Sequence, residues 1–354
     1  MKILLVGEFS GLHKELKKGL VKLGHTVTIL AAGDGWKEMD CDLKIPTGDG
    51  LISKIIAAAR QYRLIRTLDN YDVVQFIYPH IFNRLVNSYF INRLIKQNKN
   101  SFLVAAGSDA FYWKNYKQKF RYSPHDDNLL IDLKGHRGAG GEAWFKLWNR
   151  RMALAVNAVI PVAYDYRIGY EEFENVSRTI PMPFNVEDIV PQYFDIRSDK
   201  IVVLHGISRP GFKGSKYING AFDRLKDKYG DRIEIVHPER LSYAKYLEVL
   251  RKADIVVDQA LSYSYGMNAL LSTSMGKVTL SGAEPECLAE LDVIDCPIVN
   301  ILPSIEDIYS KLDSLISNRQ LIAQLSIESR IYVERVHDSK IIAERFGCVW
   351  RSFQ

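Results

Sequence analysis

The chain has 354 residues, of which 47% are hydrophobic and 25% are charged. This length suits two domains of about 150–200 residues, and the composition is that of a globular protein rather than a disordered or fibrous one. Four cysteines without a CxxC pair argue against a disulfide framework or a zinc knuckle. No apolar run reaches the roughly 20 residues of a transmembrane helix, and the one at the start is shorter than the roughly 7 residues that a signal peptide needs. We therefore expect a cytoplasmic protein.

The net charge of +5 is unevenly distributed along the chain. Residues 1–185 carry 26 Lys and Arg against 18 Asp and Glu, a net +8, and the remainder carries 21 against 24, a net −3. Basic clusters at 14–22, 54–66 and 114–121 are typical either of solvated helix faces or of a peripheral contact with anionic phospholipid at the inner membrane face, where each basic residue contributes about 1 kcal/mol. No nucleic-acid-binding motif accompanies them, so we expect no nucleic acid partner.

In chain order, the first half alternates apolar strand patterns with amphipathic helix patterns. Strands are expected at 2–6, 26–30, 72–77, 101–106 and 158–162, and helices at 12–23, 52–67, 81–97 and 142–155. Residues 110–140 are expected to form a loop-rich insert. Apolar strands that alternate with helices form parallel sheets covered on both faces, so this half predicts one doubly wound α/β domain.

A second alternation follows a break at 180–185, where two prolines within three residues favour an extended link. Strands are expected at 200–205, 232–237, 254–257 and 278–280, and helices at 215–229, 243–252, 267–275, 304–317 and 319–334, before a last segment at 338–353. The sequence thus predicts two Rossmann-like domains, at 1–183 and 184–337. Ligands of such sheets bind beyond the carboxyl ends of the strands.

Two loops of the second half carry residues suited to a phosphate group. In the first, Arg209 and Lys213 stand four residues apart in a glycine-rich loop between a strand and a helix, where cations and free backbone N–H groups suit a diphosphate. In the second, Gly266 allows close approach of a ligand to the backbone. The helix opened by Met267 and Asn268 presents about half a positive charge. Each loop alone is compatible with an ordinary α/β surface loop, and together they predict one donor-diphosphate site.

These loops resemble two signatures of the retaining family-4-type GT-B glycosyltransferases (glycosyl transferases group 1). The Arg-x-x-x-Lys-Gly run at 209–214 is similar to the donor-phosphate loop of that family. Residues 265–270 are similar to its second signature, in which a glycine turn opens a helix with a Glu–seven residues–Glu motif, and glycine turns at 276 and 282 follow in the family's order.

The resemblance implies two Rossmann-like domains facing across a cleft, with a C-terminal helix at 338–354 that returns to the N-terminal domain. It implies a hexosyltransferase, expected to retain anomeric configuration, that moves a sugar from a UDP- or GDP-linked donor to a glycan or lipid-linked acceptor in cell-surface polysaccharide synthesis. No metal or other cofactor is expected.

The chain departs from the family at its two glutamates. Aligned on Gly266, these fall on Tyr263 and Leu271. Either the donor is held differently here or catalysis has been lost. Glu284 and Glu286 stand nearby, and we take them with Tyr263 as candidate contacts of the donor sugar or nucleotide. A catalytically silent subunit that binds a sugar nucleotide or glycan is therefore an alternative, as is a GT-B-shaped sugar-nucleotide epimerase, although acids are sparse at 258–271.

The first half offers further candidates. Gly11 lies in a loop that resembles the family's first-strand loop, which faces the donor sugar. The spacing is not G-x-G-x-x-G, which argues against a nicotinamide site. His13 is a candidate catalytic residue or a surface histidine at a helix start. Asp109 is a candidate base or acceptor contact, or a local turn cap.

Overall fold

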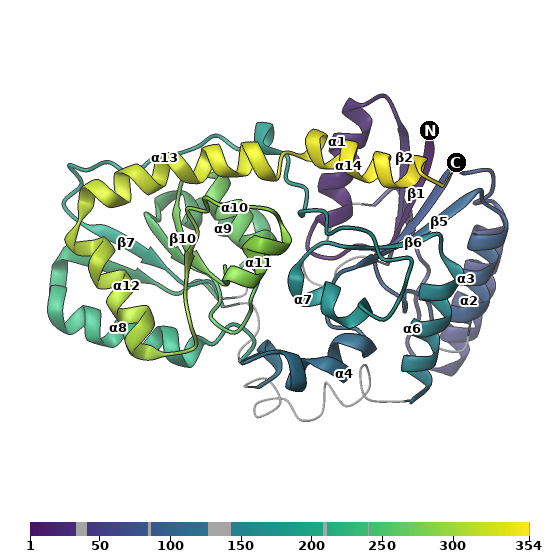
Figure 1. Cartoon of the computed structure of the whole chain (residues 1–354), viewed down its shortest axis with the longest axis horizontal. Helices are drawn as coiled ribbons and strands as arrows, with labels where there is room; N and C mark the ends of the chain where they lie inside the picture. The colour runs from purple at the N-terminus through teal and green to yellow at the C-terminus, as the bar shows by residue number, and fades with distance from the viewer. Residues whose placement is uncertain (33–40, 84–85, 127–142, 208–210, 240, 354) are drawn as a thin grey trace. The chain divides into compact units, whose positions relative to one another are not determined.

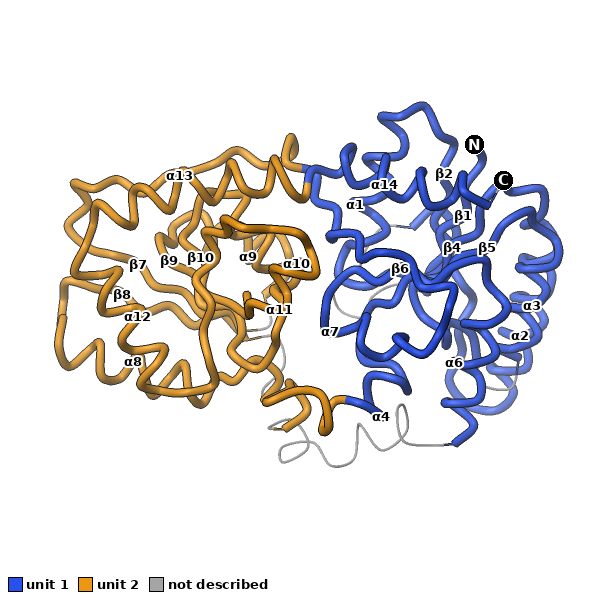
Figure 2. The backbone as a smooth tube through the Cα atoms, viewed as in Figure 1, with its two compact units in different colours: residues 1–115, 138–185, 338–354 blue, residues 116–137, 186–337 orange. Residues whose placement is uncertain are grey.

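The computed structural model describes residues 1–32, 41–83, 86–126, 143–207, 211–239 and 241–353 (Figure 1). The chain divides into two compact units (Figure 2). Unit 1 contains residues 1–115, 138–185 and 338–354, and unit 2 contains residues 116–137 and 186–337. Residues 116–126, which the sequence analysis assigned to the first domain, therefore belong to unit 2.

Unit 1 holds a six-stranded sheet in which all neighbouring strands are parallel. Its order is β3 (Leu43–Lys44), β2 (Thr26–Ala31), β1 (Lys2–Val6), β4 (Val73–Phe76), β5 (Asn100–Ala105), β6 (Ala158–Pro161). The helices are α1 (Leu12–Lys22), α2 (Leu51–Arg66), α3 (Asn87–Lys96), α4 (Ala110–Lys119, which crosses the unit boundary), α6 (Ala143–Ala155), α7 (Tyr164–Arg167) and α14 (Ser339–Arg351).

Successive strand residues point to opposite sides of a sheet. Consecutive residues of β4 and β6 are all buried, so both faces of this sheet are covered, and helices cover them. Leu4 and Val6 of β1 pack in one cluster with residues of α2, α3 and α6. The opposite face is covered by α1, on which α14 packs (Figure 1). Gly19 of α1 allows this contact, because a Cβ atom there would lie 1.9 Å from the carbonyl oxygen of Ser339.

Unit 2 holds a five-stranded parallel sheet in the order β11 (Val299–Asn300), β10 (Val278–Ser281), β9 (Ile255–Val257), β7 (Ile201–Leu204), β8 (Ile233–Val236). Its helices are α8 (Ser215–Tyr229), α9 (Tyr243–Lys252), α10 (Met267–Ser274), α11 (Pro285–Glu290), α12 (Ile305–Ser317) and α13 (Arg319–Val336). Apolar residues of β7, β9 and β10 form a core with α8 and α12. The predicted doubly wound α/β architecture is confirmed in both units.

Two predictions about elements are wrong, and some elements were not predicted. The helix expected at 81–97 begins at Asn87, because the Asn87 side chain accepts hydrogen bonds from the backbone N–H groups of Ile81 and Phe82 and holds them in a turn. Residues 110–119 of the expected loop insert are helical as α4. The segment after residue 280 also contains a short helix, α11, and the two-residue strand β11.

Candidate functional site

Three loops of unit 2 meet at the carboxyl edge of its sheet. They follow the adjacent parallel strands β7, β9 and β10, so their residues gather where ligands of doubly wound sheets bind. The first two loops are joined by a hydrogen bond of 2.9 Å from the backbone N–H of Ala260 to the carbonyl oxygen of Lys213. A Cβ atom on Gly282 in the third would lie 1.9 Å from the carbonyl oxygen of Ser262 in the second. The loops therefore form one continuous surface.

Lys213 lies in this surface and forms a largely buried ion pair. Its Nζ atom is 2.8 Å from Oδ1 of Asp258, and the two side chains are 12% and 2% exposed. The same carboxylate accepts a hydrogen bond of 2.8 Å from Nδ2 of Asn268 and one of 3.4 Å from the Ser281 hydroxyl. The predicted cation is thus present at the sheet edge, and an acid holds it in place.

His205 orders the strand-to-helix turn that carries Lys213. Its Nδ1 atom donates to the carbonyl oxygen of Val257 at 2.8 Å, and its Nε2 atom accepts from the Ser215 hydroxyl at 2.9 Å. Burial, and after it the nearby charge of Lys213, lowers the pKa of His205 to about 4. Gly214 precedes α8 with φ of 75°, a backbone conformation that favours glycine. The described ends of the turn are therefore held together by a neutral imidazole.

The second loop ends at the N-terminus of α10. Gly266 has an extended backbone, with φ of −113°, and a Cβ atom there would meet only the Gln259 amide, 4.0 Å away. Neither backbone strain nor packing within the described residues requires glycine at this position, so it leaves open space beside the first N–H groups of α10. Met267 opens that helix, and Asn268 bonds Asp258, so the three predicted residues lie together where this loop meets α10.

Arg209, the other predicted cation, lies outside the described residues. Leu271, where the family has its second glutamate, is a buried residue of α10.

Tyr263, Glu284 and Glu286 are brought together, and residues 120–126 cover them. We call this segment the strap. The backbone N–H of Arg121 donates to the Tyr263 hydroxyl at 2.7 Å. The guanidinium of Arg121 donates to Glu284 at 2.7 Å and to Glu286 at 2.6 Å. The Tyr122 hydroxyl donates to Glu284 as well. The proposed sugar-contacting acids therefore bind protein groups in this structure.

His13 in unit 1 does not face the surface. Its Nδ1 atom donates to the carbonyl oxygen of Gly7 at 2.7 Å, and Nε2 accepts from the Gln75 amide at 3.3 Å. Gln75 in turn accepts from the Trp350 indole of α14 at 3.3 Å. The His13 side chain is 0% exposed, and burial lowers its pKa to about 4. These contacts make His13 a neutral buried residue, which contradicts the surface-histidine alternative. Its catalytic role stays a prediction.

Asp109 also has a structural role. One carboxylate oxygen accepts the backbone N–H groups of Phe111 and Tyr112 at 2.9 and 3.0 Å, at the start of α4, and the other accepts from the Tyr170 hydroxyl. The side chain is 4% exposed, and burial raises its pKa. The turn-capping alternative describes these contacts, and the role of Asp109 as a base or acceptor contact stays a prediction.

Gly11 lies at the start of α1 with φ of 89°. Nothing in the structure tests its role toward a donor, and this role stays a prediction.

Comparisons with known proteins find similarity in structure alone. No protein-family model and no curated protein matches the sequence. The chain is similar to sucrose-phosphate synthase (tll1590) from Thermosynechococcus elongatus, with a TM-score of 0.65, 12% identity, and 99% and 98% of the two chains covered. It is similar to Anabaena Alr3699/HepE in complex with UDP and glucose, with a TM-score of 0.62, 12% identity, and 99% and 100% covered.

A structure described as a UDP-N-acetylglucosamine 2-epimerase from Listeria monocytogenes gives a TM-score of 0.55 at 11% identity, with 98% and 94% covered. The coverage of both units by glycosyltransferase structures is the deciding observation. The chain has the GT-B fold. At such low identity the similarity establishes the fold and leaves the activity to be argued from the site.

One group of residues in this GT-B chain was not found from the sequence. Beyond the carboxyl end of β4, His80 packs against α6, with its ring centroid 4.4 Å from that of Phe145 and 5.4 Å from that of Trp148. Its Nε2 atom donates to Asn149 at 3.0 Å, and burial lowers its pKa to about 4. The helical pattern of α6 was visible, but its pairing with His80 depends on a contact between segments about 65 residues apart.

Proposed function

We propose that the chain is a glycosyltransferase that moves a hexose from a UDP- or GDP-linked sugar to a glycan or lipid-linked acceptor. The observation that carries the proposal is the position of Lys213 beside the N-terminus of α10 at the carboxyl edge of the unit 2 sheet. Cations and helix N-termini are the groups that proteins use to hold a diphosphate. The compared Anabaena Alr3699/HepE structure is in complex with UDP and glucose, which supports the same ligand class.

In the proposed reaction, negative charge develops on the diphosphate as the bond to the sugar breaks. Lys213, together with Arg209, offsets this charge, and preorganised cations of this kind are effective because they need not reorient during the reaction. We propose that the sugar retains its anomeric configuration and that no metal ion takes part.

A second candidate, a silent binding subunit, is favoured by one observation. Tyr263 and Leu271 offer no carboxylate, and the oxygens of Glu284 are occupied by Arg121, Tyr122 and Asn300. Such a subunit would bind the sugar nucleotide without cleaving it.

The test is incubation of the purified protein with UDP- and GDP-sugars, with measurement of nucleoside diphosphate release and analysis of the sugar by NMR. We expect slow release that persists in EDTA, faster release with an acceptor, and loss of release in Arg209→Ala. Tight binding without release supports the silent subunit. Conversion of the sugar without release supports an epimerase. Absence of binding to any nucleotide contradicts the proposal.

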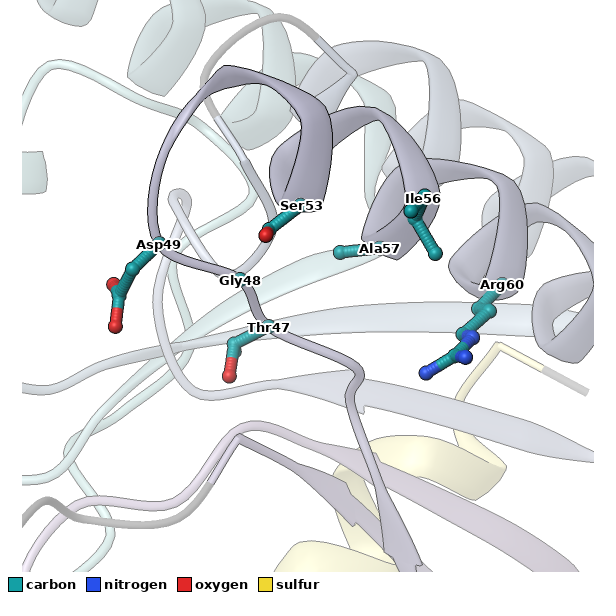
Figure 3. Close-up of a pocket in the computed structure, with 7 residues that line it drawn as sticks. All are labelled: Thr47, Gly48, Asp49, Ser53, Ile56, Ala57 and Arg60. Carbon is teal, nitrogen blue, oxygen red and sulfur yellow. The ribbon is translucent and has the colours of Figure 1, made fainter.

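The proposal includes peripheral binding to an anionic membrane at the inner membrane face, through α2. Its first turns expose four aliphatic side chains by 48% to 75%: Leu51, Ile52, Ile55 and Ile56. Four exposed basic residues share the helix: Lys54, Arg60, Arg63 and Arg66. A pocket between residues 47–49 and this helix is bordered by Ile56 and Arg60 (Figure 3). Apolar side chains beside cations are typical of helices that lie in a bilayer interface. Among helices in the described parts of the chain, none has the length and apolarity to cross a membrane.

Flotation with lipid vesicles tests this surface. We expect binding to vesicles that contain phosphatidylglycerol, and little binding to pure phosphatidylcholine. Ile52→Ser with Ile55→Ser should abolish it. Ile294→Ser, which changes a 93% exposed aliphatic residue of unit 2, is the matched control and should bind normally. Equal flotation of both variants would contradict the assignment to α2.

A further inference from the structure

The strap lies across the carboxyl ends of the three strands that border the proposed phosphate site. The ring of His125 is 6.0 Å from that of Phe212, the residue before Lys213 in the loop after β7. Arg121 bonds Tyr263 in the loop after β9, and it bonds Glu284 at the end of the loop after β10 and Glu286 in the first turn of α11. One segment of seven residues, 120–126, thus connects all three loops within unit 2.

The strap has a buried anchor. Tyr263 is 2% exposed, and its ring lies 5.0 Å from those of Phe120 and Tyr122 and 4.8 Å from the Arg121 guanidinium. The Glu284 side chain is 5% exposed and binds both Arg121 and Tyr122. Charge-assisted hydrogen bonds are about twice as strong as neutral ones, so these contacts fix the strap over the loops.

The accessible surface where the strap meets α11 is polar and carries both charges. The Arg121 side chain is 56% exposed and that of Glu286 is 33% exposed. Arg121 lowers the pKa of the Glu286 carboxyl, which is therefore ionised at neutral pH and accepts hydrogen bonds. A donor group beside an acceptor group suits the hydroxyls of a neutral sugar, whereas the net charge of one arginine and two glutamates disfavours an anion.

We propose that the strap forms the sugar-side wall of the donor site, and that Arg121 is the positioning residue that holds this wall in place. The inference rests on the proposed function, because it assigns the end of the site beyond the diphosphate. Tyr263 stands where the family has a carboxylate, and here it binds the strap through its hydroxyl and its ring. The strap and Glu286 then bind the sugar, and Lys213 and the N-terminus of α10 bind the diphosphate.

Calorimetric binding of UDP and of UDP-glucose to the full chain separates the two ends of the site. In Arg121→Ala the wall is no longer held, and the sugar should lose about one charge-assisted contact with it. We therefore expect the affinity for UDP-glucose to fall about tenfold, while the affinity for UDP changes less than about twofold. Arg121→Lys, which keeps the charge but not the two-carboxylate geometry, should recover part of the loss. Lys117→Ala removes an exposed charge from α4, just before the strap, and should match the wild type.

Hydrogen exchange of residues 120–126 gives a second readout that needs no ligand. Exchange there should accelerate in Arg121→Ala and stay unchanged in α8 and α10. If Arg121→Ala leaves exchange unchanged, or binds UDP-glucose as tightly as the wild type or more tightly, the assignment of the strap as the sugar-side wall is wrong. Equal loss of UDP and UDP-glucose also overturns it, since the effect then lies in the phosphate site. If the wild type binds neither nucleotide nor sugar nucleotide, the proposed function fails first.

Discussion

Lys213 should contribute both to the stability of unit 2 and to nucleotide binding, and variants at this position can measure the two contributions separately. The Lys213–Asp258 pair is 2.8 Å long, and Asp258 is 2% exposed. Removing one partner of a buried ion pair costs about 3–5 kcal/mol, because the remaining charge stays buried without its counter-ion. In a domain of about 150 residues, 1 kcal/mol corresponds to about 2–4 °C. Lys213→Ala should therefore lower the melting temperature of unit 2 by about 6–20 °C.

The double variant Lys213→Met with Asp258→Asn removes both charges and keeps the volume. An amide at 258 can still accept the hydrogen bond from Asn268, so most of the lost stability should return. Thermal unfolding followed by circular dichroism measures this recovery, and calorimetry with UDP and GDP measures binding. We expect the double variant to be stable and to bind nucleotide poorly. Recovery of wild-type nucleotide affinity would refute Lys213 as a phosphate ligand, and a fully stable single variant would refute the buried-pair argument.

Three further predictions concern glycines and pH. Gly282→Ala should destabilise the fold, since its Cβ atom would lie 1.9 Å from the Ser262 carbonyl oxygen, and urea unfolding measures the loss. Gly266→Ala should unfold like the wild type, because the space beside it is open, and should weaken nucleotide binding as measured by calorimetry. His13 and His205 have folded pKa values of about 4, below the ordinary 6.5. Their contribution to stability is complete above pH 6.5 and is lost as the pH falls toward 4, by about 3 kcal/mol for each. Urea unfolding at pH 7.5, 5.5 and 4.5 checks this slope, and a flat profile would contradict their burial as neutral groups.

The alternation of strands and helices was predictable because parallel strands buried on both faces are continuous apolar runs, and amphipathic helices leave a spacing of three to four residues. β1 and α8 have the predicted bounds or nearly so. α4 was not predictable in this way, because side-chain contacts hold its start in place. Asp109 caps the helix, and Asp109 is itself bonded by Tyr170, about 60 residues away in the sequence. The same limit applies to His13. Its position at a helix start suggested an exposed residue, whereas its partner Gln75 lies on β4 and is itself bonded by Trp350 of α14.

If the proposed function holds, the charges of the described residues at the sheet edge leave part of the diphosphate charge without a counter-charge. Among the described residues, Lys213 is balanced by Asp258, and Arg121 is outweighed by Glu284 and Glu286. A nucleoside diphosphate carries about −2 to −3 at neutral pH, since the second phosphate pKa is about 6. The N-termini of α8 and α10 offset about half a charge each. We expect Arg209, which lies outside the described residues, to contribute to the remaining attraction. Removing the neutral Lys213–Asp258 pair leaves the charge of the site unchanged, whereas Arg209→Ala removes a whole positive charge, so Arg209→Ala should weaken UDP binding the more strongly of the two.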